Sequence, residues 1–325
     1  MKHAIEYVLV VAIAGVMRIL PRRTRRACGR VLGSVAFAVD ARHRRVTIDN
    51  VSRAYGDEKT ESEKRAIAEG AFRHFGAMVF ELMSFGSPTS DDIDALVELE
   101  GVERYTQARA KGQGVILTTG HFGNWEVHGV AHGFRFGPVH VLARVQDNPY
   151  LNRWLEKIRS VSGNRVVYKQ NALSQLRRLL KGGETVALVI DQNVHLEDAV
   201  FVDFFGRKAA TTPVPAWFAL KMGAALMPAF CYPLANGRYR AEYAEPIDVD
   251  RYRQMERNEA VLAITQELAR VQEHYIRQRP ECWLWMHRRW KTRPPEEAAA
   301  GESIVDTASV SRDGTPDTAA VPELR

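Results

Sequence analysis

Val115-Ile116-Leu117-Thr118-Thr119-Gly120-His121-Phe122-Gly123-Asn124-Trp125-Glu126 is the stretch around which the rest of the chain is organised. Its short apolar, β-branched run predicts a buried strand that breaks at Gly120. In open α/β sheets, ligands bind beyond the carboxyl ends of the strands, because the loops there carry polar groups on a rigid support. His121 follows this strand directly and is therefore a candidate for chemistry.

The spacing of His121 and Glu126 predicts that the two side chains meet across a turn. On a straight helix, residues five apart point about 140° away from each other. Gly120 and Gly123 permit a tight turn, so we expect His121 in the loop and Glu126 in the first turn of a following helix, facing back toward the imidazole. A carboxylate there would fix the tautomer and stabilise the imidazolium. The pair predicts a histidine base for a hydroxyl group.

Two other interpretations of His121 remain open at this point. A histidine at a strand end can be a capping or core residue. A zinc site is the second, because His128 and His132 follow at the helical i, i+4 spacing that suits zinc. Neither the H-E-x-x-H order nor a clear further ligand accompanies them, and we expect no metal and no cofactor.

Composition predicts one sizeable domain with appendages. The chain has 325 residues and 46% apolar content, which is enough to bury a large core. Its three cysteines, Cys28, Cys231 and Cys282, lie far apart, which suits a reducing compartment without a disulfide framework.

The basic character of the chain belongs to its N-terminal segment. Residues 1–53 hold 11 Lys and Arg against 3 Asp and Glu, whereas the remainder holds 34 against 36. The sequence contains no basic stripe with interleaved aromatics, so its charge does not indicate nucleic-acid binding. Residues 7–20 are apolar and end before Arg22-Arg23-Thr24-Arg25-Arg26, but at about 14 residues they fall short of the ~20 that span a bilayer. Residues 1–26 therefore predict a membrane anchor helix with a polybasic flank at the cytoplasmic face; a buried N-terminal helix is the alternative.

The remaining pattern predicts an α/β fold with a central, largely parallel mixed sheet flanked by helices. Residues 27–294 form the predicted domain, and residues 295–325, poor in large apolar side chains, form a predicted disordered tail. Expected strands cover residues 97–101, 115–119, 139–143, 165–168, 186–190, 225–231 and 238–243. Expected helices cover residues 27–39, 61–83, 102–111, 148–161, 173–181, 214–222 and 253–278.

Polar residues after two further strands point to the same edge of the sheet as His121. Arg144 follows one of these strands, and Asp191-Gln192-Asn193 follows another. A surface salt bridge for Arg144 and a turn cap for Asp191 are the alternatives. Trp283, Trp285 and Trp290 lie among cations, which suits either a membrane interface or core packing.

A series of motifs gives the chain its resemblance to a known family. After Gly120-His121-Phe122-Gly123-Asn124-Trp125-Glu126 come Arg144 with Asp147-Asn148-Pro149, Asp191-Gln192-Asn193, Phe204-Phe205-Gly206 with Thr211-Thr212-Pro213, Pro228, and residues 287–294. In this order they resemble the lysophospholipid acyltransferase superfamily, most closely the branch that adds secondary lauroyl and myristoyl chains to lipid A.

The resemblance implies an inner-membrane O-acyltransferase that moves a fatty acyl group from acyl carrier protein or acyl-CoA to a hydroxyl of a glycolipid such as a lipid A precursor. By that analogy His121 and Glu126 are the catalytic pair. Phosphatidylinositol mannosides, aminolipids and lysophospholipids are alternative acceptors, and a zinc hydrolase is a further alternative. The substrate-binding residues that the resemblance and the sheet edge suggest are Gly120, Phe122, Gly123, Asn124, Arg144, Asp191, Gln192, Asn193, Phe205, Gly206, Thr212 and Pro213.

Overall fold

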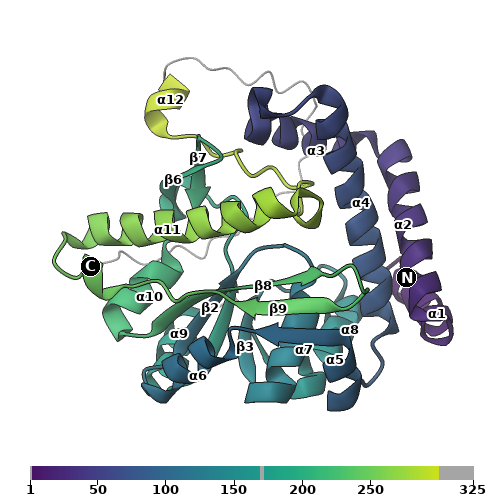
Figure 1. Ribbon diagram of the computed structural model, residues 1–325, viewed down its shortest axis with the longest axis horizontal. Coiled ribbons are helices and arrows are strands. Elements are labelled where there is room, and N and C mark those ends of the chain that lie inside the picture. The colour runs from purple at the N-terminus through teal and green to yellow at the C-terminus, as the bar shows by residue number, and fades with distance from the viewer. Residues whose placement is uncertain (1, 169–171, 300–325) are drawn as a thin grey trace.

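A seven-stranded sheet forms the centre of the computed structural model, which describes residues 2–168 and 172–299 (Figure 1). Its strand order is β1-β9-β8-β2-β5-β3-β4. The strands are β1 (Val97–Glu100), β2 (Val115–Thr119), β3 (Val139–Ala143), β4 (Arg165–Tyr168), β5 (Thr185–Val189), β8 (Ala225–Pro233) and β9 (Tyr239–Tyr243). Neighbouring strands are parallel except β8 and β9, which are antiparallel. The predicted largely parallel mixed sheet is confirmed.

Helices cover both faces of this sheet. On one face, apolar side chains of the sheet pack against α9 (Ala172–Lys181), α10 (Val214–Met222) and α11 (Arg257–Gln278). On the other face lie α5 (Ser90–Leu96), α6 (Val102–Ala110) and α7 (Trp125–Phe136). Central β2 is buried on both sides, which explains its continuous apolar run. Helix α8 (Pro149–Arg159) links β3 to β4 and contacts α7.

Helices of the N-terminal part of the chain pack together. They are α1 (Lys2–Ile19), α2 (Arg22–Val39), α3 (Ala41–Tyr55) and α4 (Glu61–Ser84). Three of them, α1, α2 and α4, lie along one side of the sheet, with α3 packed on α4 (Figure 1). Helix α4 begins at a capping box, in which Thr60 and Glu63 each accept from the other's backbone N–H. Large apolar side chains of α1 and α2, among them Val8, Leu9, Val31 and Val35, are exposed. Within the described ranges, no helix combines the length and the hydropathy needed to cross a bilayer.

The last third of the chain adds a hairpin and a C-terminal segment. Strands β6 (Val200–Phe204) and β7 (Arg207–Thr211) join through Phe205 and Gly206, both with positive φ. Trp283, Trp285 and Trp290 are buried in the core beside this hairpin, so their core-packing alternative holds. Short 3-10 helices cover Gly56–Glu58, Ser160–Ser162, Leu196–Asp198, Asp250–Tyr252 and Pro280–Cys282.

The predicted tail begins with a short helix, α12 (Pro295–Ala299). Residues 300–325 lie outside the described residues, so most of the tail prediction falls there. The predicted boundary near residue 294 therefore stays a prediction.

Candidate active site

His121 lies just beyond the carboxyl end of β2, and Asp191 lies just beyond the end of β5. The two strands are parallel neighbours, and the N–H of Ile190 donates to the carbonyl of Thr119 at 3.0 Å. This pairing places the two polar side chains at the same edge of the sheet, as the strand ends predicted.

The carboxylate that holds the His121 ring is that of Asp191. Its Oδ1 lies 2.8 Å from His121 Nδ1, and its Oδ2 accepts from the His121 backbone N–H at 2.7 Å. Oδ2 also accepts from Trp283 Nε1 at 2.8 Å, and the Asp191 side chain is fully buried. A buried carboxylate with three N–H donors stays ionised, so it binds the Nδ1–H tautomer and leaves Nε2 for the substrate side.

The electrostatics of this pair favour a basic histidine. Burial lowers the pKa of His121, but the charge and hydrogen bond of Asp191, with a smaller effect of Glu126, outweigh burial and raise it above its ordinary value. Burial raises the pKa of Asp191, and the charges of His121 and His287 with the hydrogen bonds from His121 and Trp283 bring it well below its usual range. The imidazolium that would form on proton uptake is stabilised.

Glu126 lies in the first turn of α7, as predicted, but its carboxylate faces a different partner from the expected one. Arg159, at the end of α8, donates from Nε to Glu126 Oε2 at 2.9 Å and from Nη2 to Oε1 at 2.5 Å. Trp125 Nε1 donates to the same carboxylate at 3.2 Å. Because β5 brings Asp191 to the ring nitrogen, Glu126 acts on His121 through its charge rather than as the ring's hydrogen-bond acceptor.

The backbone of the loop between β2 and α7 is hydrogen-bonded to other segments of the chain. Gly120 and Gly123 are required there: a Cβ on Gly120 would lie 3.0 Å from Asp191 Oδ2, and Gly123 has φ 59°. The N–H of Gly123 donates to the Cys282 carbonyl at 2.8 Å, and that of Asn124 donates to the Cys231 carbonyl at 2.7 Å. These two N–H groups are therefore engaged within the protein and do not serve as donors to a bound substrate.

A cavity of about 650 Å³ opens beside His121. Glu126 and Arg159 line it with His121, and apolar side chains of β2, β3, β5 and α9 form much of the remaining wall. Four of the predicted binding residues also line it, namely Arg144, Gln192, Asn193 and Thr212. Arg144 is two-thirds exposed and pairs with Asp147 at 3.0 Å, so the salt bridge considered for it is present.

Other predicted binding residues have structural positions away from the cavity wall. Phe122 is buried against Phe230, and Asn124 caps α7 through its side-chain oxygen. Phe205 and Gly206 form the β6–β7 turn, and Pro213 precedes α10. The structure thus gives these residues places in the core, in a turn and at helix starts.

Residues 280–292 form a C-terminal segment that contacts the site, although it lies far from His121 in the sequence. Besides the Trp283 bond to Asp191, the N–H of Leu284 donates to the His121 carbonyl at 2.9 Å. Thr292 binds the Asn193 side chain in both directions at 2.9 Å. Buried Arg289 donates to the Ala210 carbonyl at 2.6 Å. Arg159 and Trp283 are the two site residues that sequence reasoning missed, since no local spacing relates them to His121.

His128 and His132 do not form a metal site with His121. His132 Nδ1 lies 2.8 Å from the Tyr243 hydroxyl, and the His128 ring packs against the Tyr243 ring. Burial lowers the pKa of His128 to about 4 and that of His132 to about 3. Within the described part of the chain, no group of three or more His, Cys, Asp or Glu side chains is arranged to hold a metal ion.

Known proteins resemble this chain over most of its length. A family model described as bacterial lipid A biosynthesis acyltransferase matches residues 1–292. The lipid A biosynthesis lauroyltransferase of Escherichia coli K12 is 26% identical, with 83% of this chain and 85% of the relative covered. The palmitoleoyltransferase of the same organism is 25% identical, over 83% and 86% of the two chains. A phosphatidylinositol mannoside acyltransferase of Mycolicibacterium smegmatis is 26% identical, over 58% and 60%.

The match extends over nearly the whole chain and includes the β2–α7 loop, the β5 end and the C-terminal segment that build the site. The predicted resemblance is thereby confirmed. The chain is an acyltransferase and belongs to the bacterial lipid A biosynthesis acyltransferase family.

Proposed function

We propose that the chain transfers a fatty acyl group from acyl carrier protein or acyl-CoA to a hydroxyl of a glycolipid such as a lipid A precursor. One observation carries the proposal: Asp191 holds His121 through Nδ1, and the His121 ring lines a cavity with a largely apolar wall. A base beside an apolar cavity suits a hydroxyl acceptor and a long acyl chain.

The mechanism follows from the tautomer. Nε2 of neutral His121 removes the proton of the acceptor hydroxyl while its oxygen attacks the thioester carbonyl. The carbon–sulfur bond then breaks, and the imidazolium returns the proton to the departing thiolate. Asp191 stabilises the imidazolium between these two steps, through the hydrogen bond to Nδ1.

Direct transfer is favoured over an acyl-enzyme. Cys231 and Cys282 are buried, and burial raises the pKa of both thiols far above its ordinary value, which keeps them unreactive. Neither thiol lines the cavity beside His121.

Glu126 and Arg159 both line the cavity and act together. Burial lowers the pKa of Arg159, but the hydrogen bonds and charge of Glu126 outweigh burial and raise it, so the guanidinium keeps its charge. A cation fixed on the cavity wall can stabilise the oxyanion of the tetrahedral intermediate. Glu126 thus holds Arg159 and adds to the basicity of His121.

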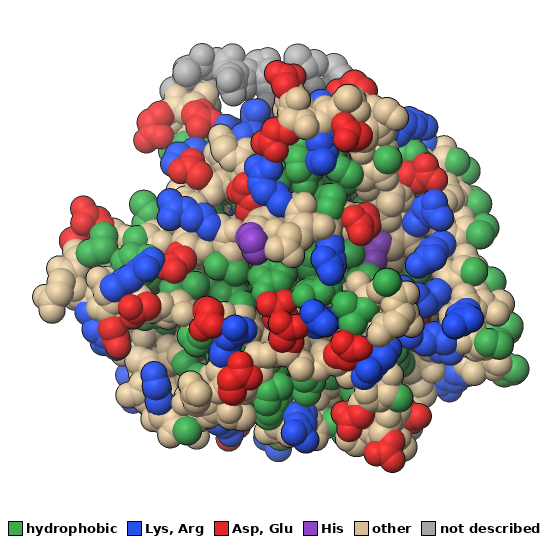
Figure 2. Space-filling model, viewed as in Figure 1, with side chains coloured by type: hydrophobic (Ala, Val, Ile, Leu, Met, Phe, Trp, Pro, Cys, Tyr) green, Lys and Arg blue, Asp and Glu red, His purple; other side chains and the backbone are tan. Residues whose placement is uncertain are grey.

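The inner membrane, at its cytoplasmic face, is the proposed location. In Figure 2, hydrophobic and basic side chains lie side by side along the edge that α1 and α2 form. Exposed Val8, Leu9, Val31 and Val35 belong to these helices. Such a mixture suits helices that lie in the head-group region of an anionic membrane. Residues 1–26 are the proposed anchor.

The first experiment is mass spectrometry of total membrane lipids from cells with and without the protein. We expect one acyl chain to be missing from a particular glycolipid in its absence, and restored by the wild type but not by His121→Ala. Loss of a general base should lower turnover by on the order of a hundredfold or more. A phosphatidylinositol mannoside is the second candidate acceptor, because the relative from Mycolicibacterium smegmatis is named a phosphatidylinositol mannoside acyltransferase.

Unchanged lipids in cells that normally express the protein would contradict the proposal, as would near-wild-type turnover by a folded His121→Ala protein. Inactivation by a chelator, with stoichiometric zinc in the purified protein, would indicate the hydrolase alternative instead.

A further inference from the structure

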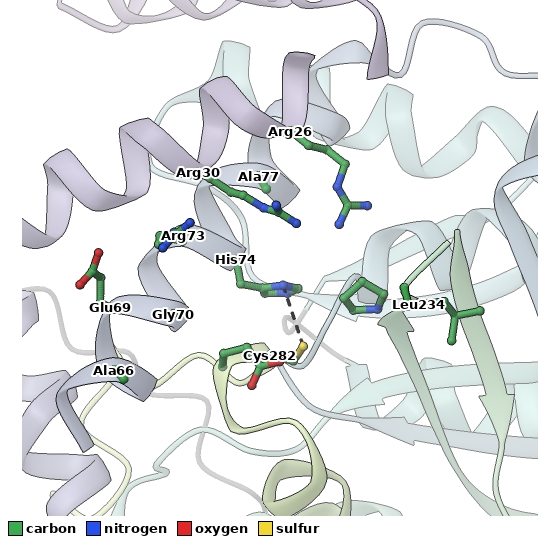
Figure 3. A pocket seen from close by; sticks show the side chains of 13 residues that line it. Arg26, Arg30, Ala66, Glu69, Gly70, Arg73, His74, Ala77, Leu234 and Cys282 are labelled. Carbon is green, nitrogen blue, oxygen red and sulfur yellow. Dashed lines mark hydrogen bonds between the residues drawn. The ribbon is translucent and has the colours of Figure 1, made fainter. Parts of the chain in front are cut away.

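A second cavity, of about 520 Å³, lies between α2, α4 and the chain that follows β8 (Figure 3). It shares no lining residue with the cavity beside His121. Three arginines line it: Arg26 and Arg30, one helical turn apart on α2, and Arg73 on α4. In Figure 3, Arg26 and Arg30 reach from α2 toward His74. Guanidinium groups gathered in a cavity suit a phosphate group.

The charges of these arginines are incompletely neutralised. Arg26 Nη1 lies 3.6 Å from Glu81 Oε2, but Glu81 also binds Arg22 at 2.6 Å. Within the residues that the structure describes, the guanidinium groups of Arg30 and Arg73 make no hydrogen bond or ion pair. The carboxylates of Glu69 and Glu281 also line the cavity. Together with the Arg22–Glu81 pair, four arginines lie against three carboxylates. An anion with several acceptor oxygens would satisfy the unpaired N–H donors.

An apolar groove of about 510 Å³ adjoins this cavity. Arg30 and Arg73 line both hollows, and the rest of the groove is formed by α2. Its other lining residues are Ala27, Val31, Ser34, Val35 and Ala38. The cationic cavity therefore opens into a hydrocarbon-lined groove, and a ligand that fits both parts is an amphiphile with an anionic head.

The two helices that form this site are locked together. An added Cβ on Gly29 of α2 would lie 2.5 Å from the carbonyl oxygen of Gly76 on α4, and Gly33 is equally close to the backbone of α4. Such contact fixes the spacing of the arginines before any ligand binds, and a preformed site loses less conformational entropy on binding.

The floor of the cavity touches the active-site loop. His74 Nε2 donates to the carbonyl of Gly123 at 3.0 Å, and the Cys282 thiol lies 3.9 Å from His74 Nδ1 (Figure 3). Burial lowers the pKa of His74 to about 4, so the ring is neutral at physiological pH.

We propose that this site binds an anionic phospholipid of the membrane, with its phosphate among Arg26, Arg30 and Arg73 and an acyl chain in the groove along α2. The lipid is neither acyl donor nor acceptor, since the site is separate from the cavity beside His121. It attaches the enzyme to the bilayer through a specific contact that reaches the loop carrying the candidate base.

The test measures binding of short-chain phosphatidylglycerol to the full-length protein by native mass spectrometry and calorimetry. We expect one tight site, with at least tenfold weaker binding of a neutral diacylglycerol of the same chain length and of inorganic phosphate. Arg30→Gln/Arg73→Gln should weaken phosphatidylglycerol binding at least tenfold. Val31→Ser/Val35→Ser should weaken it severalfold and leave phosphate binding unchanged.

A matched control is Arg177→Gln/Arg178→Gln, which removes the same charge from exposed positions on α9 and should leave binding unchanged. Equal binding to wild type and Arg30→Gln/Arg73→Gln would overturn the proposal. Binding of inorganic phosphate as tight as that of the lipid would indicate a free-phosphate site and would also overturn it. So would a raised KM for a phosphorylated glycolipid acceptor in Arg30→Gln/Arg73→Gln with phosphatidylglycerol binding intact.

Discussion

Replacing Asp191 by asparagine tests the central contact of the site. Oδ2 of Asp191 accepts from two N–H groups, those of the His121 backbone and Trp283 Nε1. The asparagine oxygen must take that position, because an amide NH₂ there would face two donors. Its NH₂ then faces His121 Nδ1 and requires that nitrogen to accept. The proton of the imidazole is driven to Nε2, which is the wrong tautomer for a base on the cavity side.

The size of the effect follows from what the carboxylate supplies. Removing one partner of a buried ion pair costs about 3–5 kcal/mol. Here the loss of the Asp191 charge destabilises the imidazolium form of His121, so the activation free energy rises by about that amount. At 1.36 kcal/mol per decade, kcat should fall by roughly two to four orders of magnitude.

The pH profile gives a second readout of the same change. In the wild type, Asp191 raises the pKa of His121. As the pH falls, the ring is therefore protonated at a pH above the ordinary pKa of histidine, and activity should decline there. Without Asp191, burial is the largest remaining influence and lowers the pKa. The acid limb of kcat should therefore move to lower pH while the maximum falls.

The assay is acyl transfer in detergent micelles at a series of pH values, with thermal unfolding as a check on folding. Asp250→Asn, which changes an exposed carboxylate paired with Arg253, is the matched control and should keep kcat within about twofold. A folded Asp191→Asn protein with more than a tenth of the wild-type kcat, or with an unshifted acid limb, would refute the reasoning.

Three further predictions concern the cavity. Arg159→Gln leaves the buried Glu126 carboxylate without its guanidinium, so kcat should fall at least tenfold, and Arg159→Lys should recover part of it in the same assay. Gly129 lines the cavity, and a Cβ added there would meet only Asn164, at 3.8 Å. Gly129→Leu should therefore fill part of the cavity and shift the preference of the enzyme to donors with shorter acyl chains. In a competition between donors, kcat/KM should change by about fourfold per excluded methylene. Burial lowers the pKa of His128 to about 4, so between about pH 6.5 and pH 4 this histidine is protonated in the unfolded state but not in the folded state. The free energy of unfolding therefore falls as the pH is lowered through that range. His128→Leu should remove roughly 3 kcal/mol of that loss, measured by urea titration at several pH values.

The sequence predicted the sheet well because its strands are short β-branched runs that end at glycine or polar residues. The bounds of β3 and α10 coincide with those predicted. The β6–β7 hairpin was missed, since its turn places Phe205 at φ 52°, a conformation that few side chains adopt. The contacts of Gly29 and Gly33 with α4 were not predicted, because the spacing of the two glycines does not identify the helix that packs against them.

The site was predicted in part, and the missing part is long-range. Strand ends placed His121 and Asp191 at one edge of the sheet, but only the strand order, with β5 beside β2, makes them partners. Glu126 was chosen as partner because it is near in sequence, whereas its own partner Arg159 lies 33 residues away. Contacts of that separation depend on packing and not on local spacing.

The C-terminal segment has a consequence for how the enzyme comes into being. Trp283 supplies a bond to the carboxylate that orients His121, and Leu284 and Cys282 bind the loop backbone at His121 and Gly123. A chain leaving the ribosome has made His121 well before any of these residues exists. Until residues 282–284 are made, the nascent protein therefore remains without its oriented base. Competence for acyl transfer arises only when residues 282–284 have emerged and docked.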